Sequence, residues 1–104
     1  LTLVTGKALT SNIEYMGYSG EKGKWLWVYD VNSITTTDNV TPVDKTYNQV
    51  KIYLSGFSGT YTVDVYDTVN GNVIESKSVT ANLGYVSITL KNFSKDTAVA
   101  IYKN

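Results

Sequence analysis

The stretch KWLWVYD, residues 24–30, alternates aromatic and aliphatic side chains at every second position. Trp25, Trp27 and Tyr29 form one set, and Leu26 and Val28 form the other. Successive side chains of an extended strand point to opposite faces of a sheet, so one set faces the core and the other faces away from it. An outward aromatic row offers a platform for a ligand, whereas an inward row provides packing only.

The rest of the chain follows the same period of two. No window of eleven residues carries a helical stripe, and short alternating segments are separated by turn signals every eight to twelve residues or so. This pattern predicts an all-β protein, an antiparallel β-sandwich of immunoglobulin-like or jelly-roll-like type with about seven to nine short strands. A length of 104 residues predicts one domain over residues 1–104. The last strand, TAVAIYK, is expected at a sheet edge.

Turn residues divide the expected strands. Asn70-Gly71 favours a tight hairpin turn, and Asn82-Leu83-Gly84 joins the two strands that follow. The segment between Val31 and Thr46 predicts a long loop or a short edge strand. Tyr61 follows a glycine-bounded turn at the spacing of the tyrosine corner of immunoglobulin-like sandwiches.

Composition excludes several classes of function. Nine lysines balance nine acidic residues and arginine is absent, so nucleic acid is not an expected partner. Cysteine and histidine are also absent, which excludes disulfides, thiolate nucleophiles, imidazole bases and the common zinc sites. The chain has no apolar run of membrane-spanning length, so no membrane partner is expected. Richness in Thr, Ser, Asn, Tyr and Val with few charges predicts a secreted, extracellular bacterial module.

The carboxylates are candidates for catalysis and for metal binding. Glycoside hydrolysis needs two carboxylates held across a cleft, and Asp64 with Glu75, or Asp30 with Asp96, are the pairs considered. Nothing in the sequence brings either pair into a pocket, so a solvated role is favoured and no enzyme activity is expected. No catalytic metal or cofactor is expected. Structural calcium remains open through three oxygen-bearing residues of the long loop, Asp38, Asn39 and Asp44.

The chain resembles the non-catalytic β-sandwich domain that follows the catalytic barrel of bacterial glycoside hydrolases, and related polysaccharide-binding modules. The resemblance rests on the segments KWLWVYD, GTYTVDVYDTVNGNVIESKSV and NFSKDTAVAIYKN, with a D-T-x-x-G turn and an F-S-x-D-x-A ending. It covers residues 24–104, with Thr97 where an aliphatic residue is usual and no counterpart for residues 18–23. It implies a secreted module attached to a carbohydrate-active enzyme, a class that includes both sugar binders and inert spacers.

The aliphatic residues of the other strands decide the orientation of KWLWVYD. The residues expected to face inward are nearly all branched aliphatics, and Leu26 and Val28 are residues of the same kind. Burying both indoles would add two side chains of about 200 Å² each to a small core. We therefore expect the aromatics to face outward, with core packing as the alternative. The expected carbohydrate-binding residues are Trp25, Trp27, Tyr29, Tyr53 and Tyr66.

Two functions are consistent with this sequence. The first is a carbohydrate-binding module that targets an attached glycoside hydrolase to plant cell-wall β-glucan, xyloglucan, mannan or xylan. Aromatic side chains spaced about 6.6 Å apart along a strand suit the apolar faces of successive sugar rings. The second is a structural immunoglobulin-like domain that packs against a catalytic barrel, in which case the aromatic row is an interdomain contact.

Overall fold

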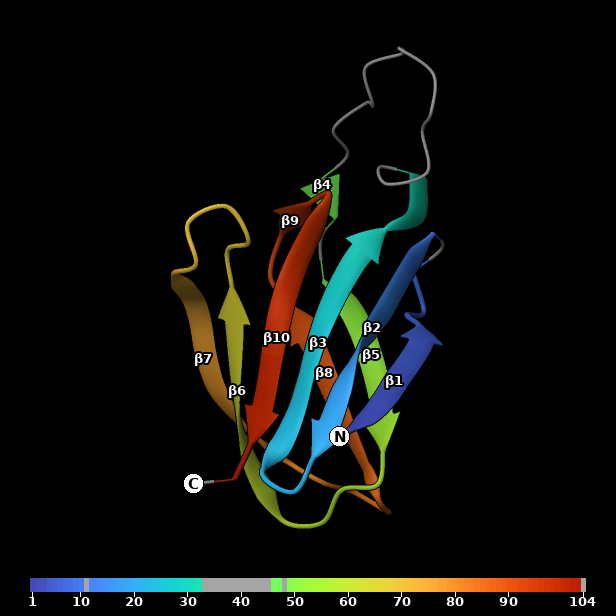
Figure 1. Cartoon of the computed structure of the whole chain (residues 1–104), viewed down its shortest axis with the longest axis vertical. Coiled ribbons are helices and arrows are strands. Elements are labelled where there is room, and N and C mark those ends of the chain that lie inside the picture. Colours follow the sequence, from blue (N-terminus) through green and yellow to red (C-terminus); the bar gives the residue numbers. More distant parts are fainter. Residues whose placement is uncertain (11, 33–45, 48, 104) are drawn as a thin grey trace.

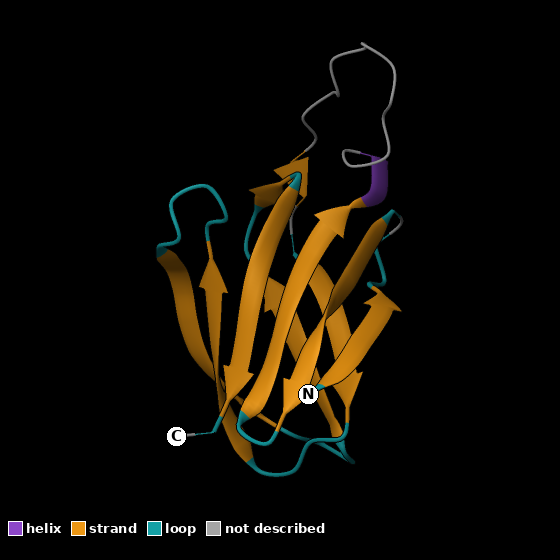
Figure 2. Ribbon diagram, in the orientation of Figure 1, coloured by secondary structure: helices purple, strands orange, loops and turns teal. Residues whose placement is uncertain are grey.

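The computed structural model describes residues 1–10, 12–32, 46–47 and 49–103, and this part of the chain is built of antiparallel β-strands (Figures 1 and 2). The predicted all-β sandwich is confirmed, with ten strands where about seven to nine were expected. Two of the ten, β4 and β9, are only two residues long. The strands are β1 (Thr2–Lys7), β2 (Ile13–Gly20), β3 (Gly23–Asp30), β4 (Thr46–Tyr47), β5 (Val50–Ser55), β6 (Thr60–Tyr66), β7 (Val73–Thr80), β8 (Tyr85–Leu90), β9 (Phe93–Ser94) and β10 (Asp96–Tyr102).

Six strands form one sheet in the order β1-β2-β3-β10-β6-β7 (Figure 1). The remaining strands form two pairs, β5 with β8 and β4 with β9. The expectation that the last strand lies at a sheet edge is wrong, because β10 pairs with β3 on one side and with β6 on the other. Its alternating side chains allow this interior position: Val99 and Ile101 face the core, and Ala98 and Ala100 face outward between two neighbouring strands.

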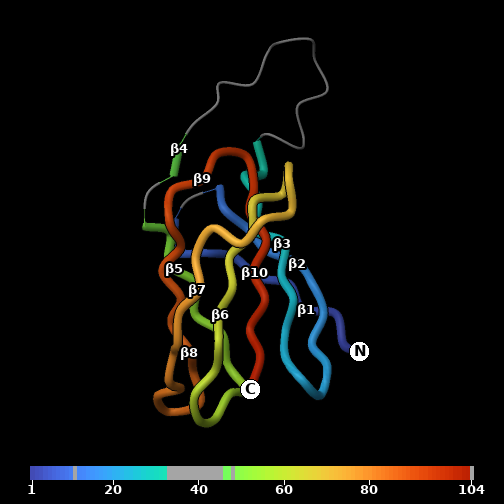
Figure 3. Tube along the Cα trace, turned by 90° about the vertical axis from the view of Figure 1, so that its left-hand side faces the viewer, coloured from blue at the N-terminus to red at the C-terminus, as the bar shows by residue number. Residues whose placement is uncertain are grey.

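The core lies between the six-stranded sheet and the β5–β8 pair. Figure 3 shows β5 and β8 on one side of the molecule and β1, β2 and β3 on the other. Every residue predicted to face inward is buried, and this set consists of Leu26, Val28, Val50, Ile52, Leu54, Val63, Val65, Val86, Ile88, Leu90, Val99 and Ile101. Burial of branched aliphatic side chains supplies the main stabilising free energy of such a sandwich.

Hydrogen bonds are present at the predicted tyrosine corner and at the predicted turn between β7 and β8. The hydroxyl oxygen of Tyr61 accepts a hydrogen bond from the backbone N–H of Ser58 at 3.2 Å, as in a tyrosine corner. Leu83 and Gly84 both have positive φ between β7 and β8, and the flanking Asn82 and Tyr85 exchange both backbone hydrogen bonds. That is the geometry of a type I′ turn.

The hairpin around Gly71 is also present, but its loop is longer than a tight turn. It occupies the residues between Tyr66 and Val73, where Asp67 accepts hydrogen bonds from two backbone N–H groups of the loop through its side chain. Gly71 has a φ of 76°, a conformation that glycine adopts at no steric cost. The predicted loop between Val31 and Thr46 lies mostly outside the described residues, which resume at β4.

Thr97, a polar residue where an aliphatic one was expected, is buried in the core face of β10. Its Oγ1 donates a hydrogen bond to the backbone carbonyl of Tyr66 at 2.9 Å. A buried hydroxyl costs little when it is hydrogen-bonded in this way. The polar residue is therefore accommodated without disturbing the strand pairing.

Candidate functional site

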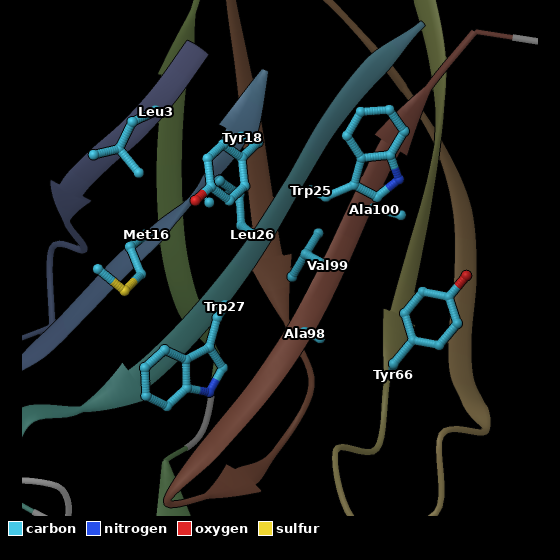
Figure 4. Close-up of a pocket in the computed structure, with 11 residues that line it drawn as sticks. Leu3, Met16, Tyr18, Trp25, Leu26, Trp27, Tyr66, Ala98, Val99 and Ala100 are labelled. Atoms are coloured by element: carbon cyan, nitrogen blue, oxygen red, sulfur yellow. The ribbon is translucent and has the colours of Figure 1, made fainter. Parts of the chain in front are cut away.

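The outer face of the six-stranded sheet carries a hollow of about 420 Å³ (Figure 4). Its volume lies within the ~300–1,000 Å³ range of small-ligand sites. Side chains of β1, β2, β3, β10 and β6 contribute to it. The lining residues are Leu3, Met16, Gly17, Tyr18, Trp25, Leu26, Trp27, Tyr66, Ala98, Val99 and Ala100.

Strand β3 supplies the two indoles because its aliphatic residues are held in the core. Leu26 and Val28 are buried, so the alternation of the strand turns Trp25 and Trp27 to the outer face. Trp25 is 45% exposed. Figure 4 shows its indole over β10 beside Ala100. The outward orientation predicted for the two tryptophans is therefore correct.

Tyr29 was predicted to belong to the exposed row, and the structure corrects this. Its side chain is only 8% exposed because the indole of Trp27 lies against it, with ring centroids 4.4 Å apart and planes inclined by 30°. Aromatic pairs at this separation attract one another. Tyr29 supports Trp27 and presents no free ring face to a ligand.

Trp27 is also fixed by a hydrogen bond. Its Nε1 donates to Oδ2 of Asp96 at 2.9 Å, and Oδ1 of the same carboxylate accepts a hydrogen bond from Thr68 at 2.5 Å. These contacts join β3 to β10 and to the loop after β6. They hold the Trp27 indole in one orientation before any ligand arrives, which reduces the entropy that binding costs.

Small residues make the hollow possible at its centre. Ala98 lies opposite Trp27 on one neighbouring strand and opposite Tyr66 on the other, and Ala100 lies opposite Trp25. Two methyl groups between larger aromatic side chains leave a depression along β10. Sequence analysis missed both alanines because a small residue signals a groove only when its neighbours in the sheet are known.

A polar network lies beside this depression on β6. The carboxylate of Asp64 accepts hydrogen bonds from the hydroxyls of Ser76 and Tyr102, both at 2.6 Å. Donation from Ser76 and then from Tyr102 holds the pKa of Asp64 below its ordinary value, although desolvation by burial opposes this. The same interaction with Asp64 raises the pKa of Tyr102 above 10.0.

The lowered pKa of Asp64 predicts an acid-dependent contribution to stability. A carboxyl group with a lower pKa in the folded state contributes fully above its unfolded pKa, near 3.8, and the contribution is lost as pH falls through the folded pKa. Asp64→Asn should therefore make the free energy of unfolding less dependent on pH in the acid range. Urea denaturation of both proteins at about pH 6, 4 and 3 measures this, and parallel pH profiles would contradict it.

Tyr53 and Tyr85 are exposed, as expected for the outward phase of their strands. They belong to the β5–β8 pair, however, and not to the six-stranded sheet. The strand β5 does not adjoin β3, so Tyr53 lies apart from the aromatic residues of KWLWVYD. The strand β6 does not adjoin β3 either, but Tyr66 lies in the same sheet, across Ala98 of β10. Of the five predicted residues, Trp25, Trp27 and Tyr66 line one hollow.

A second hollow, of about 650 Å³, lies beside β7 and β8 and is lined by charged groups. Lys77 Nζ lies 2.7 Å from Oε1 of Glu75 and donates a hydrogen bond to the carbonyl of Thr89. Lys91 Nζ lies 3.8 Å from the other oxygen of Glu75. These charges are engaged with one another, and no aromatic ring lines the hollow, so it does not offer a stacking surface.

The two carboxylate pairs weighed for hydrolysis do not share a face of the sheet. Asp64 points outward, whereas Glu75 lies opposite the inward Val65. Asp30 is buried and accepts a hydrogen bond from the hydroxyl of Tyr47 at 2.8 Å, whereas Asp96 lies on the outer face. Neither pair can therefore flank one glycosidic bond.

Within the described residues there is no group of three or more acidic, histidine or cysteine side chains placed to hold a metal ion. The loop residues considered for calcium lie outside this part of the chain. No helix in the described ranges has the length and apolar character needed to cross a membrane.

Comparison of the chain with protein-family models, with curated proteins and with solved structures found no significant match. The fold and the site therefore define its class by themselves: an antiparallel β-sandwich with an apolar, aromatic-lined hollow on the outer face of its larger sheet.

Proposed function

We propose that this protein is a non-catalytic carbohydrate-binding module that attaches a glycoside hydrolase to plant cell-wall polysaccharide. The supporting observation is the hollow formed by Trp25, Trp27 and Tyr66 around the small side chains of β10. A sugar ring presents an apolar face of C–H groups, which packs favourably against the flat face of an aromatic side chain.

The arrangement favours one sugar ring over β10. Trp27 and Tyr66 lie on the two strands that flank β10, and Ala98 between them leaves room for a ring beside Trp25. Polar groups lie near the depression on both sides. The Trp27 indole and the Asp96 carboxylate lie on one side, and the Tyr102 hydroxyl and the Asp64 carboxylate lie on the other. A mostly apolar hollow with a few polar groups at its margin is typical of small-ligand sites.

Affinity electrophoresis tests the proposal directly. The isolated domain should migrate more slowly in gels containing soluble β-glucan, xyloglucan, mannan or xylan than in gels without polysaccharide. Bovine serum albumin in the same gels controls for sieving. Unchanged mobility in all four polysaccharides would refute glycan binding by this hollow.

A substitution that fills the depression should weaken glycan binding while the domain remains folded. Ala98→Leu adds three carbon atoms to a partly exposed position between Trp27 and Tyr66, and these atoms occupy the space proposed for the sugar. We expect the dissociation constant for the retarding polysaccharide to rise at least about tenfold, equivalent to ~1.4 kcal/mol. Isothermal titration measures it. Ser87→Leu, on the exposed face of β8, adds similar bulk as a control and should leave the constant unchanged.

The part of the hollow over β1 and β2 favours a second function, contact with a neighbouring protein domain. Leu3, Met16 and Tyr18 extend the apolar surface over β1 and β2, and all three are exposed. A contiguous apolar surface of this kind also suits contact with a neighbouring protein domain. Tryptophan fluorescence distinguishes the two functions. Quenching by iodide in the isolated domain, with protection in a polypeptide that includes the catalytic barrel and no glycan retardation, supports the structural role.

A further inference from the structure

Charge is distributed unevenly around the hollow. The outward faces of β3, β10 and β6 carry two carboxylates, Asp96 and Asp64, and no lysine. The one lysine within these three strands, Lys24, lies on the other side of the sheet, where its Nζ donates to the carbonyl of Ser55 at 2.8 Å and lies 4.5 Å from the ring centroid of Phe57. No cation on these three strands is therefore available to pair with an anionic ligand, and on the two other strands that line the hollow Lys7 of β1 lies opposite Glu14 of β2.

Both carboxylates are held in place by hydrogen bonds. Asp96 accepts hydrogen bonds from the Trp27 indole and the Thr68 hydroxyl, and Asp64 accepts them from Ser76 and Tyr102. Hydrogen bonds of this kind fix the direction in which each carboxylate points. All four donors are neutral groups, so they orient the negative charges without cancelling them.

The carboxylates do not line the hollow but lie beside residues that do. Asp64 is opposite Ala100, and Asp96 is two residues from Ala98 on the same face of β10. Directly opposed residues of antiparallel strands have Cβ atoms about 4.5–5.5 Å apart, and residues two apart along one strand are separated by about 6.6 Å. Both separations are less than the ~8 Å Debye length at physiological salt. A negative group on a bound sugar would thus meet two like charges that salt screens only in part, and it would lose hydration without a compensating partner.

From this geometry, and given the proposed function, we infer that the hollow selects uncharged polysaccharides and rejects those that carry carboxylates on their sugars. The discriminating residues are Asp64 and Asp96. The selection is a repulsive one: it disfavours the charged ligand while leaving apolar stacking of the neutral ligand intact.

Polymers with one backbone and different charge test the inference. Hydroxyethylcellulose is compared with carboxymethylcellulose, and neutral arabinoxylan with glucuronoxylan, by isothermal titration at low salt. The neutral member of a pair that binds should bind at least about tenfold more tightly than the acidic member. Raising the salt from about 20 mM to about 300 mM should narrow this ratio, because added ions screen the repulsion.

Two variants test whether the carboxylates cause the neutral-to-acidic affinity ratio. Asp64→Asn and Asp96→Asn each remove one negative charge while keeping an oxygen acceptor, and each should lower the neutral-to-acidic affinity ratio about threefold or more. Glu21→Gln, in the turn between β2 and β3, makes the same change in net charge at a residue that does not line the hollow and is not part of the three central strands, and it should leave the ratio unchanged.

The outcomes separate the two proposals. Equal or tighter binding of the acidic polymers, or a ratio that neither salt nor the asparagine variants change, overturns the charge selection and leaves glycan binding standing. Failure of every polymer, neutral and acidic, to bind overturns the proposed function together with this inference.

Discussion

Replacing Trp25 with alanine should abolish retardation of the domain in polysaccharide gels. The indole is the most accessible of the aromatic rings that line the hollow on β3, and it lies over β10 at the centre of the proposed site. Truncating a central aromatic anchor typically costs about 2 kcal/mol or more of binding free energy. The dissociation constant should therefore rise about 30-fold, which takes a weak interaction beyond the range that electrophoresis detects.

Two further variants test whether the effect is specific to Trp25. Tyr53→Ala removes an aromatic ring of similar exposure, 48% against 45%, from the other sheet and should leave retardation unchanged. Trp27→Ala should also weaken binding, but partly by freeing Tyr29 and Asp96, which Trp27 now contacts. Retardation that survives Trp25→Ala, or that Tyr53→Ala removes equally, would place the glycan elsewhere.

Gly17→Ala should destabilise the whole sheet, with a loss of about 3 kcal/mol or more in the free energy of unfolding. A Cβ at Gly17 would lie 1.8 Å from the carbonyl oxygen of Trp25 and 2.9 Å from the Cα of Leu26. These are backbone atoms of the paired strand β3, so relief requires β2 and β3 to separate and lose ladder hydrogen bonds. Urea denaturation followed by tryptophan fluorescence measures the loss.

Gly6→Ala provides the comparison on the neighbouring strand. A Cβ there would lie 2.3 Å from the hydroxyl oxygen and 2.4 Å from Cζ of Tyr15, which are side-chain atoms and not backbone atoms of a paired strand. We expect a smaller loss, about 1–2 kcal/mol, within the usual range for overpacking. Equal losses at the two glycines would show that the close approach of β2 to β3 has no special cost.

Much of the fold follows from local pattern. Val63 and Val65, or Ile88 and Leu90, recur at every second position, and all four are buried in the structure. The hydroxyl of Tyr61 reaches the backbone three residues upstream, an interaction that sequence spacing predicts because both partners belong to one turn. Such features depend on residues near one another in the chain, so the sequence contains the information needed to predict them.

The candidate site was predictable only in part. The alternation of β3 predicts outward indoles, but it gives Tyr29 the same orientation as Trp25, and the two rings differ greatly in exposure. Tyr29 is covered because Trp27 folds onto it, held by Asp96 of a distant strand. Side-chain direction within a face is set by such contacts, which a period of two does not specify.

The sequence by itself determined which side of each strand is buried, because branched aliphatic residues at alternate positions leave water most favourably when one whole face of a strand is covered. Only the tertiary structure decided that β10 lies between β3 and β6, which sets Ala98 and Ala100 among aromatic rings and leaves Tyr53 on the other sheet. Strand order depends on pairing between segments far apart in the chain, and many strands with the same alternation are locally equivalent partners.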